Sequence, residues 1–136
     1  KVKEEYSVQL PKLDLDEKYM KQALLNIIKN GISAMPEGGT LLVGTSVDGN
    51  DVLLQIGDTG IGIPDENISK IFEPYFTTRE FGSGLGLTVV YKIIREHGGE
   101  ISLSSKEGEG TVFTLSFPVP DSERNLIEWE DTGDEF

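Results

Sequence analysis

Two pairs of short apolar runs, each joined by a polar turn that contains glycine, limit this 136-residue chain to a narrow set of folds. Residues 41–47 and 52–56 form the first pair, and residues 101–105 and 111–117 form the second. Strand-length runs separated by such turns predict β-hairpins. The sheet of this protein is therefore expected to be largely antiparallel.

Helical spacing precedes each hairpin. A first helix is expected to begin after Asp14 or Asp16, with Asp14 and Glu17 fitting a capping box, and to run to about residue 35. A second helix is expected over residues 85–97, with a glycine pair after it. The apolar residues of the first helix recur at steps of three and four and so share one face: Met20, Ala23, Leu24, Ile27, Ile28, Gly31 and Ala34.

Two further segments complete the order of elements. The loose alternation over residues 4–10 predicts an edge strand, and the apolar segment 68–76 is expected to be partly helical. The two amphipathic helices must bury their apolar faces, and we expect them to do so against one face of the sheet. The predicted fold class is α/β, a two-layer sandwich whose mixed, mostly antiparallel sheet is covered on one face by helices.

Acidic charge is concentrated at the C-terminus. Residues 121–136 hold seven acidic residues and one Arg, and so contribute −6 of the formal net charge of −12. We expect residues 1–120 to form one domain, and residues 121–136 to be an acidic tail that either docks or is disordered. A chain with this charge repels phosphodiester backbones, which argues against nucleic acid as a partner.

Signals for secretion or membrane insertion are not found in the sequence. It has no cysteine, no apolar run near the roughly 18 residues that cross a bilayer, and no apolar segment behind its first residues. We therefore expect a cytoplasmic domain that makes no direct membrane contact.

Three polar motifs carry chemistry. Asn26 and Asn30 stand one helical turn apart and are either solvated or helix-capping residues, or a pair whose neutral amide oxygens bind Mg²⁺. Asp58 ends a strand before Gly60 and Gly62, where its carboxylate either accepts from a base amine or closes an Asx-turn. The third motif runs from Gly82 through Ser83, Gly84 and Leu85 to Gly86 and opens a helix, so its backbone amides suit phosphate.

Arg79 lies in the polar loop between Thr77-Thr78 and the glycine motif. It either neutralises the charge of a transferred phosphoryl group or is a solvated surface residue. The only histidine, His97, follows a helix and precedes two glycines, a position that favours a structural role.

Together, these motifs resemble the catalytic ATP-binding domain of two-component sensor histidine kinases, closest to the nitrogen-regulation type. The superfamily also includes gyrase, MutL and heat-shock chaperone ATPases, and its fold is of the Bergerat type. The resemblance covers roughly residues 10–118. Its five boxes occur in order: Asn26 to Asn30, Asp58 to Gly62, Phe72 to Thr78, Gly82 to Leu87, and Gly108 to Thr111 with Phe113.

The resemblance implies specific roles. Asn30 would ligate Mg²⁺ with help from Asn26, Asp58 would accept from the adenine amine, and Gly60 and Gly62 would shape the base pocket. Residues 73–86 would form a mobile lid over ATP. The lid residues expected to contact the nucleotide are Thr77, Thr78, Gly82, Ser83, Gly84, Leu85 and Gly86, and the catalytic pair would be Asn30 and Arg79.

The resemblance also implies that the γ-phosphate of ATP is transferred to an acceptor and not released by hydrolysis. The ATPase branches carry a water-activating Glu where this chain has Asn26, so hydrolysis is expected to be slow. The γ-phosphate would pass instead to a histidine on a separate dimerisation domain, and a response regulator would act downstream. Two residues depart from the family pattern. Gly31, in place of the commoner Ala, is expected to weaken the helix by up to ~1 kcal/mol. Ser33, in place of an acid or Lys, leaves open which group beyond Arg79 and Lys29 supports the phosphates.

Three other functions remain open at this point. The same boxes occur in serine kinases of the anti-sigma-factor type. A hydrolysing conformational clamp is disfavoured by Asn26 and by the length of the chain. A nucleotide-binding interaction module without transfer activity is the third alternative.

Overall fold

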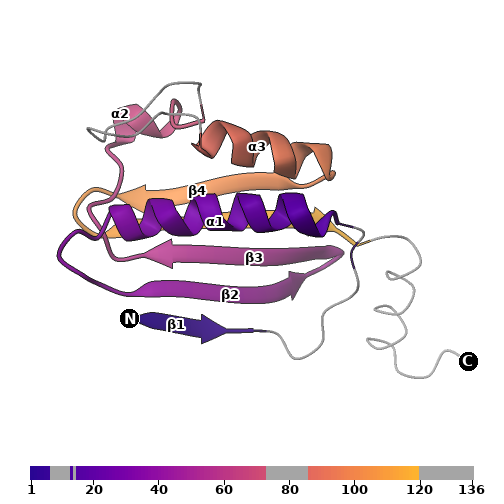
Figure 1. Ribbon diagram of the computed structural model, residues 1–136, viewed down its shortest axis with the longest axis horizontal. Helices are drawn as coiled ribbons and strands as arrows, with labels where there is room; N and C mark the ends of the chain where they lie inside the picture. Colours follow the sequence, from indigo (N-terminus) through magenta and orange to yellow (C-terminus); the bar gives the residue numbers. More distant parts are fainter. Residues whose placement is uncertain (7–12, 14, 73–85, 120–136) are drawn as a thin grey trace, which may run out of the picture.

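The computed structural model describes residues 1–6, 13, 15–72 and 86–119 (Figure 1). The expected tail at 121–136 lies outside these residues. No helix in the described ranges is both long and apolar enough to cross a bilayer. The elements in chain order are β1 (Val2–Glu5), α1 (Glu17–Ser33), β2 (Leu41–Asp48), β3 (Asp51–Asp58), α2 (Asp65–Ile68), α3 (Gly86–Glu96), β4 (Glu100–Lys106) and β5 (Gly110–Pro118).

The strands form one five-stranded sheet in the order β1-β2-β3-β5-β4. Both predicted hairpins are confirmed: β2 pairs antiparallel with β3, and β4 pairs antiparallel with β5. The central pair β3–β5 is also antiparallel, and only β1 runs parallel to its neighbour β2. The sheet is thus mixed and mostly antiparallel, as expected.

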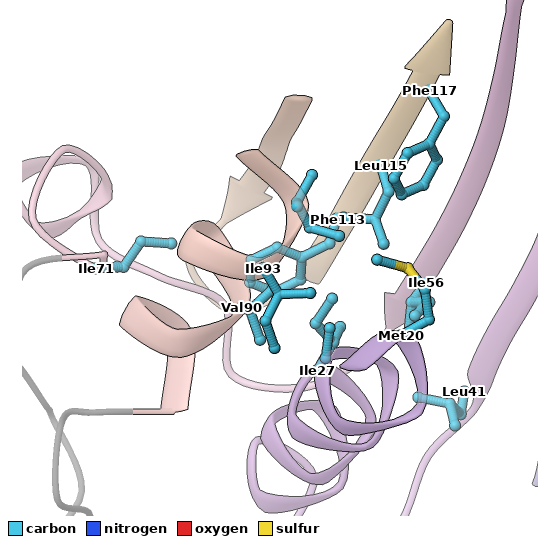
Figure 2. Close-up of a cluster of buried hydrophobic side chains, with 12 residues drawn as sticks. Met20, Ile27, Leu41, Ile56, Ile71, Val90, Ile93, Phe113, Leu115 and Phe117 are labelled. Carbon is cyan, nitrogen blue, oxygen red and sulfur yellow. The ribbon is translucent and has the colours of Figure 1, made fainter. Parts of the chain in front are cut away.

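Helices α1 and α3 pack against each other and cover one face of this sheet (Figure 1). Their buried residues meet those of β2, β3 and β5 in a single cluster, which Figure 2 shows between the two layers. Burying each aliphatic side chain of this kind contributes about 1.5–3 kcal/mol. The cluster comprises Met20, Ala23, Ile27, Leu41, Ile56, Ile71, Val90, Ile93, Ile94, Phe113, Leu115 and Phe117.

The N-terminal strand differs from the prediction. It covers Val2–Glu5 instead of starting at residue 4, and residues 7–10 lie outside the described part of the chain. All four residues of β1 are exposed, so the strand has no apolar alternation to reveal it. Parallel backbone pairing with β2 holds it, and the first bond runs from Leu41 N to Lys1 O at 2.8 Å.

Helix α1 begins at Glu17 because Asp16 caps it. Asp16 Oδ1 accepts from the backbone nitrogens of Lys18 and Tyr19 at 3.0 and 3.3 Å. The alternative of a capping box between residues 14 and 17 is wrong, because Glu17 occupies the first helical position and not the third. The helix ends at Ser33, about two residues earlier than expected.

The other two helices are also displaced at their ends. Helix α3 spans Gly86–Glu96 and closes with Gly98 at a φ of 75°, while Gly99 N donates to Ile94 O at 2.9 Å. Helix α2 covers Asp65–Ile68, where two acidic residues favour a helix start. The expected partly helical segment at 68–76 therefore overlaps α2 only at Ile68; residues 69–72 form turns, and residues 73–76 lie outside the described part of the chain.

Candidate functional site

The second half of α1 contacts both other motif segments. Asn26 Nδ2 donates to the carbonyl oxygen of Gly86, the first residue of α3, at 3.4 Å. At the end of the same helix, Ile61 N donates to Ala34 O at 2.9 Å, which brings in the loop after Asp58. Parts of three motifs that are far apart in the sequence therefore meet along the second half of α1 and the residue that follows it.

Asn26 and Asn30 are half-buried and lie on a flank of α1, beside its buried stripe. Asn26 uses its amide nitrogen in the bond to Gly86, which leaves its amide oxygen as an acceptor. Neutral amide oxygens fit Mg²⁺, which usually binds few protein groups and takes its other ligands from phosphates and water. Among the described residues, no group of three or more His, Cys, Asp or Glu offers an alternative metal site.

Asp58 is the last residue of β3 and is half-buried. Its Oδ1 accepts from Gly60 N at 2.9 Å, so the Asx-turn is present. Burial raises the pKa of Asp58 above its ordinary value of 3.8, while hydrogen bonds from the backbone of Gly60 and Thr111 partly oppose the rise. The second oxygen, Oδ2, faces α1, where a Cβ added to Gly31 would lie 3.5 Å away.

Gly60 and Gly62 let the loop after Asp58 pack between two backbones. A Cβ at Gly60 would collide with the carbonyl oxygen of Ala34 at the end of α1. A Cβ at Gly62, whose φ is 73°, would collide with the carbonyl oxygen of Lys106 at the end of β4. These glycines thus set the path of the chain beside Asp58, and their part in a base pocket stays a prediction.

Ser105 is a site residue that the sequence reasoning missed. Its Oγ accepts from Ile63 N at 2.8 Å and lies 2.7 Å from Thr111 Oγ1 and 3.0 Å from Gly110 O. Thr111 is 5% exposed and pairs with Asp58 across β3 and β5. The sequence of β4 held a signal for this residue: Ser105 follows Ile101 and Leu103 at intervals of two, on the inner side of the strand.

Seven predicted site residues lie outside the described part of the chain: Thr77, Thr78, Arg79, Gly82, Ser83, Gly84 and Leu85. The residues on either side of segment 73–85 are close together. Thr88 Oγ1 in the first turn of α3 donates to Phe72 O at 2.8 Å, and the rings of Phe72 and Tyr91 lie 5.4 Å apart. Gly86 is exposed at the start of α3.

His97 has the structural role that its position indicated. Its Nε2 accepts from the backbone nitrogen of Asp16 at 3.2 Å, so its Nδ1 carries the hydrogen that Ile93 O accepts at 2.7 Å. The ring therefore joins the end of α3 to the start of α1, at the opposite end of α3 from Gly86.

Comparison with known proteins assigns the family. The model of the histidine kinase-, DNA gyrase B- and HSP90-like ATPase family matches residues 15–121. The chain belongs to this family. The predicted resemblance and the two-layer fold are thereby confirmed, and the chain is an ATP-binding domain of this ATPase family.

Its relatives include histidine kinases. Sporulation kinase E of Bacillus subtilis (strain 168) is 44% identical over 111 residues, which cover 81% of this chain and 15% of that protein. The solved catalytic domain of the histidine kinase ThkA is 33% identical, with a TM-score of 0.76 and coverage of 87% of this chain and 78% of that one. Full-length ShkA in complex with AMPPNP is 31% identical, with a TM-score of 0.76 and coverage of 86% and 25%.

Proposed function

We propose that this chain binds Mg-ATP and donates the γ-phosphate to a histidine on a separate helical dimerisation domain, in two-component signalling within the cytoplasm. A response regulator would receive the phosphoryl group afterwards. The chain spans 15% of the length of its kinase relative from Bacillus subtilis, so the acceptor histidine is sought in a further domain or partner chain.

One observation carries the proposal: the second half of α1 meets both the end of β3 and the start of α3. Asn26 bonds to Gly86 and Ala34 bonds to Ile61, so amide oxygens, a carboxylate and a helix N-terminus share one location. Amide oxygens suit a metal, the carboxylate suits an amine, and the helix N-terminus suits phosphate. This combination matches the three parts of Mg-ATP.

We assign the roles as follows. Asn30, with Asn26, would hold Mg²⁺, and the carboxylate of Asp58 would accept from the adenine amine. When bound, Mg²⁺ would neutralise phosphate charge. The residues that would surround the phosphates are Thr77, Thr78, Gly82, Ser83, Gly84, Leu85 and Gly86, with Arg79 opposing the charge that develops during transfer.

Transfer is favoured over hydrolysis because Asn26 is a neutral amide that cannot take a proton from water at neutral pH. The carboxylate at the site, Asp58, already accepts from Gly60 and lies at the end of β3 facing Gly31, where adenine is expected. ATP would therefore persist until an acceptor imidazole arrives.

The decisive experiment is phosphoryl transfer from labelled ATP to the histidine-bearing domain of the same kinase. We expect an acid-labile, base-stable phosphohistidine on the acceptor and little free phosphate without it. An acid-stable product would indicate a serine kinase instead, and rapid phosphate release without acceptor would indicate a hydrolysing ATPase.

Variants of the two amides on α1 sharpen this experiment. Asn30→Ala is expected to abolish transfer and to remove the Mg²⁺ dependence of ATP binding in calorimetry. Gln22→Ala removes an exposed amide from the same helix and is the matched control, with transfer unchanged. If Asn30→Ala binds ATP as tightly as the wild type with Mg²⁺ present, the metal assignment is wrong and a binding module without transfer is favoured.

A further inference from the structure

The solvent-facing side of α1 carries a positive, partly apolar surface on an acidic protein. From Lys18 to its end, α1 contains three lysines and no acidic residue, whereas the whole chain has 24 acidic and 12 basic residues. Leu25 is 53% exposed and Ile32 is 57% exposed. We call this surface the outer face of α1; its residues are Lys18, Lys21, Leu25, Lys29 and Ile32, all exposed.

These five residues lie on one side of the helix. Lys18, Leu25 and Ile32 follow each other at intervals of seven, and Lys21, Leu25 and Lys29 at intervals of four. The buried stripe of α1 is on the opposite side, against the sheet, so the core does not use these residues. Glu17 is the single acid of α1, and it pairs with Lys21 at 3.0 Å.

The chain itself supplies a segment with complementary chemistry. Residues 121–136 contain seven acidic residues and one Arg, and among them stand Leu126, Ile127 and Trp129. Acidic side chains suit the lysines of the outer face, and the apolar side chains suit Leu25 and Ile32. Each surface alone leaves large apolar groups in water, and contact between them would remove both from it.

The tail also leaves the fold at the right place. Val119 is buried, and its backbone nitrogen donates to Asn50 O at 2.8 Å, which ties down the last described residue. A Cβ at Gly99, just after α3, would lie 2.8 Å from the ring of Phe117, and His97 accepts from the backbone nitrogen of Asp16, the N-cap of α1. The end of β5 and the start of α1 thus share one end of the molecule (Figure 1).

Reach and concentration both permit contact within one molecule. Helix α1 has 17 residues, about 25 Å at 1.5 Å per residue. Residues 121–136 could extend for about 50 Å. A short tether of this kind gives an effective concentration on the order of millimolar. We propose that the acidic tail, residues 121–136, docks on the outer face of α1.

The tail reports on its own docking, because Trp129 is the only tryptophan in the chain. Fluorescence of the full chain at low salt is the test, with a synthetic peptide of residues 120–136 as the undocked reference. We expect the emission of Trp129 to be blue-shifted and its acrylamide quenching constant to be reduced by about twofold or more. A reduction of this size follows if at least half of the molecules have the tail docked, as a millimolar effective concentration would allow. Raising salt to about 1 M, where the Debye length is about 3 Å, is expected to move both values toward those of the peptide.

Two variant pairs test the surface. Lys18→Glu/Lys21→Glu and, separately, Leu25→Ser/Ile32→Ser are expected to shift Trp129 to the peptide values. Their controls change exposed residues elsewhere: Lys3→Glu/Lys70→Glu reverses the same number of charges, and Val2→Ser removes an exposed apolar side chain. Circular dichroism checks that each variant is folded. The charge variant and the apolar variant are independent, so if one of them fails to fold, the other still tests the proposal.

Three results would overturn the proposal. The first is a wild-type quenching constant equal to that of the peptide. The second is a protected Trp129 that neither variant of the outer face exposes, which would place the tail on another surface. The third is protection that disappears on dilution, which would assign the face to a second copy of the chain instead of its own tail.

Discussion

The hydroxyl oxygens of Ser105 on β4 and Thr111 on β5 lie 2.7 Å apart, beside the strand end that carries Asp58. Ser105 Oγ also accepts from Ile63 N at 2.8 Å. One hydroxyl group therefore connects the loop that follows Asp58 with the hairpin β4–β5. The position of Asp58 relative to α1 depends on this connection as well as on the Asx-turn.

Ser105→Ala is expected to lower the free energy of unfolding by about 1–2 kcal/mol, because Ile63 N loses its partner in a half-buried place. ATP affinity should fall as well, since the loop beside Asp58 is released. Chemical denaturation and calorimetry measure the two effects. Ser104→Ala, on the exposed side of the same strand, is the control and is expected to change stability by less than about 0.5 kcal/mol. Equal effects of the two substitutions would contradict the anchoring role.

The raised pKa of Asp58 predicts a pH dependence of stability. The folded chain holds this proton more tightly than the unfolded chain, so Asp58 contributes stability that is fully present below pH 3.8. The contribution is lost as the pH rises through the raised pKa of the folded state. We expect Asp58→Asn to lack this decline when denaturation is measured from acid to neutral pH, while Asp48→Asn, at the exposed end of β2, retains it.

Nucleotide binding should show the opposite trend at the same residue. An adenine amine donates to the ionised carboxylate, so ATP affinity of the wild type is expected to rise as Asp58 ionises. Asp58→Asn should bind weakly at every pH, and its affinity should lack this component. A carboxyl titration by NMR that places the pKa of Asp58 at or below 3.8 would contradict the predicted pH dependence of stability. An ATP affinity that does not change as Asp58 ionises would contradict its predicted role in binding.

Gly62 and Gly108 form a matched pair for testing the close packing of the site loop. Both have positive φ, 73° and 84°, so alanine costs about 1–2 kcal/mol at either position through backbone strain. Only Gly62→Ala meets an obstacle, the carbonyl oxygen of Lys106, whereas nothing lies within 4 Å of a Cβ at Gly108.

We therefore expect Gly62→Ala to lose an additional ~1–3 kcal/mol of stability through overpacking, and to lose ATP binding. Thermal denaturation and calorimetry of the two variants measure the difference. If Gly108→Ala were as damaging as Gly62→Ala, backbone strain alone would explain the cost, and the packing of the loop against β4 would be unimportant.

Gly31 has a packing reason to be glycine. A Cβ there would lie 3.1 Å from Leu41 Cδ1, which is crowded, and 3.5 Å from Asp58 Oδ2, which is ordinary contact. Gly31→Ala is thus expected to gain less than the ~1 kcal/mol that helix propensity alone would supply.

Shortening the neighbour should restore that gain. In a double-mutant cycle with Leu41→Val, we expect Gly31→Ala to be more favourable in the shortened background by about 0.5 kcal/mol or more, as for residues in contact. A full gain from Gly31→Ala in the wild type, with no coupling to Leu41, would show that the helix and β2 are not crowded at this point.

Much of the architecture could be predicted because it depends on neighbours in the chain. The apolar spacing from Met20 to Gly31 specified α1, and the glycine turns specified both hairpins, since helical and strand periodicities are local properties. Asn26, Asn30 and Asp58 were identified as candidate site residues for a related reason. Their side-chain chemistry and their order along the chain can be taken from the sequence before any fold is known.

Contacts between distant segments were beyond that reasoning. The side chains of the exposed residues Val2–Glu5 do not indicate a strand that pairs parallel with β2. Strand pairing uses backbone hydrogen bonds, which form whatever the side chains are. Ser105 was missed because its value lies in meeting Ile63, 42 residues away, and Thr111 on the neighbouring strand.

Residue identity and spacing were thus sufficient for α1, α3, the hairpins, the family and the chemistry that each motif offers. Packing in three dimensions set the burial that raises the pKa of Asp58, the close approach of Gly60 and Gly62 to neighbouring backbones, and the meeting of Asn26 with Gly86. The division has a physical origin. Periodicity and capping act over a few residues, whereas desolvation and steric fit depend on which atoms the completed fold brings together.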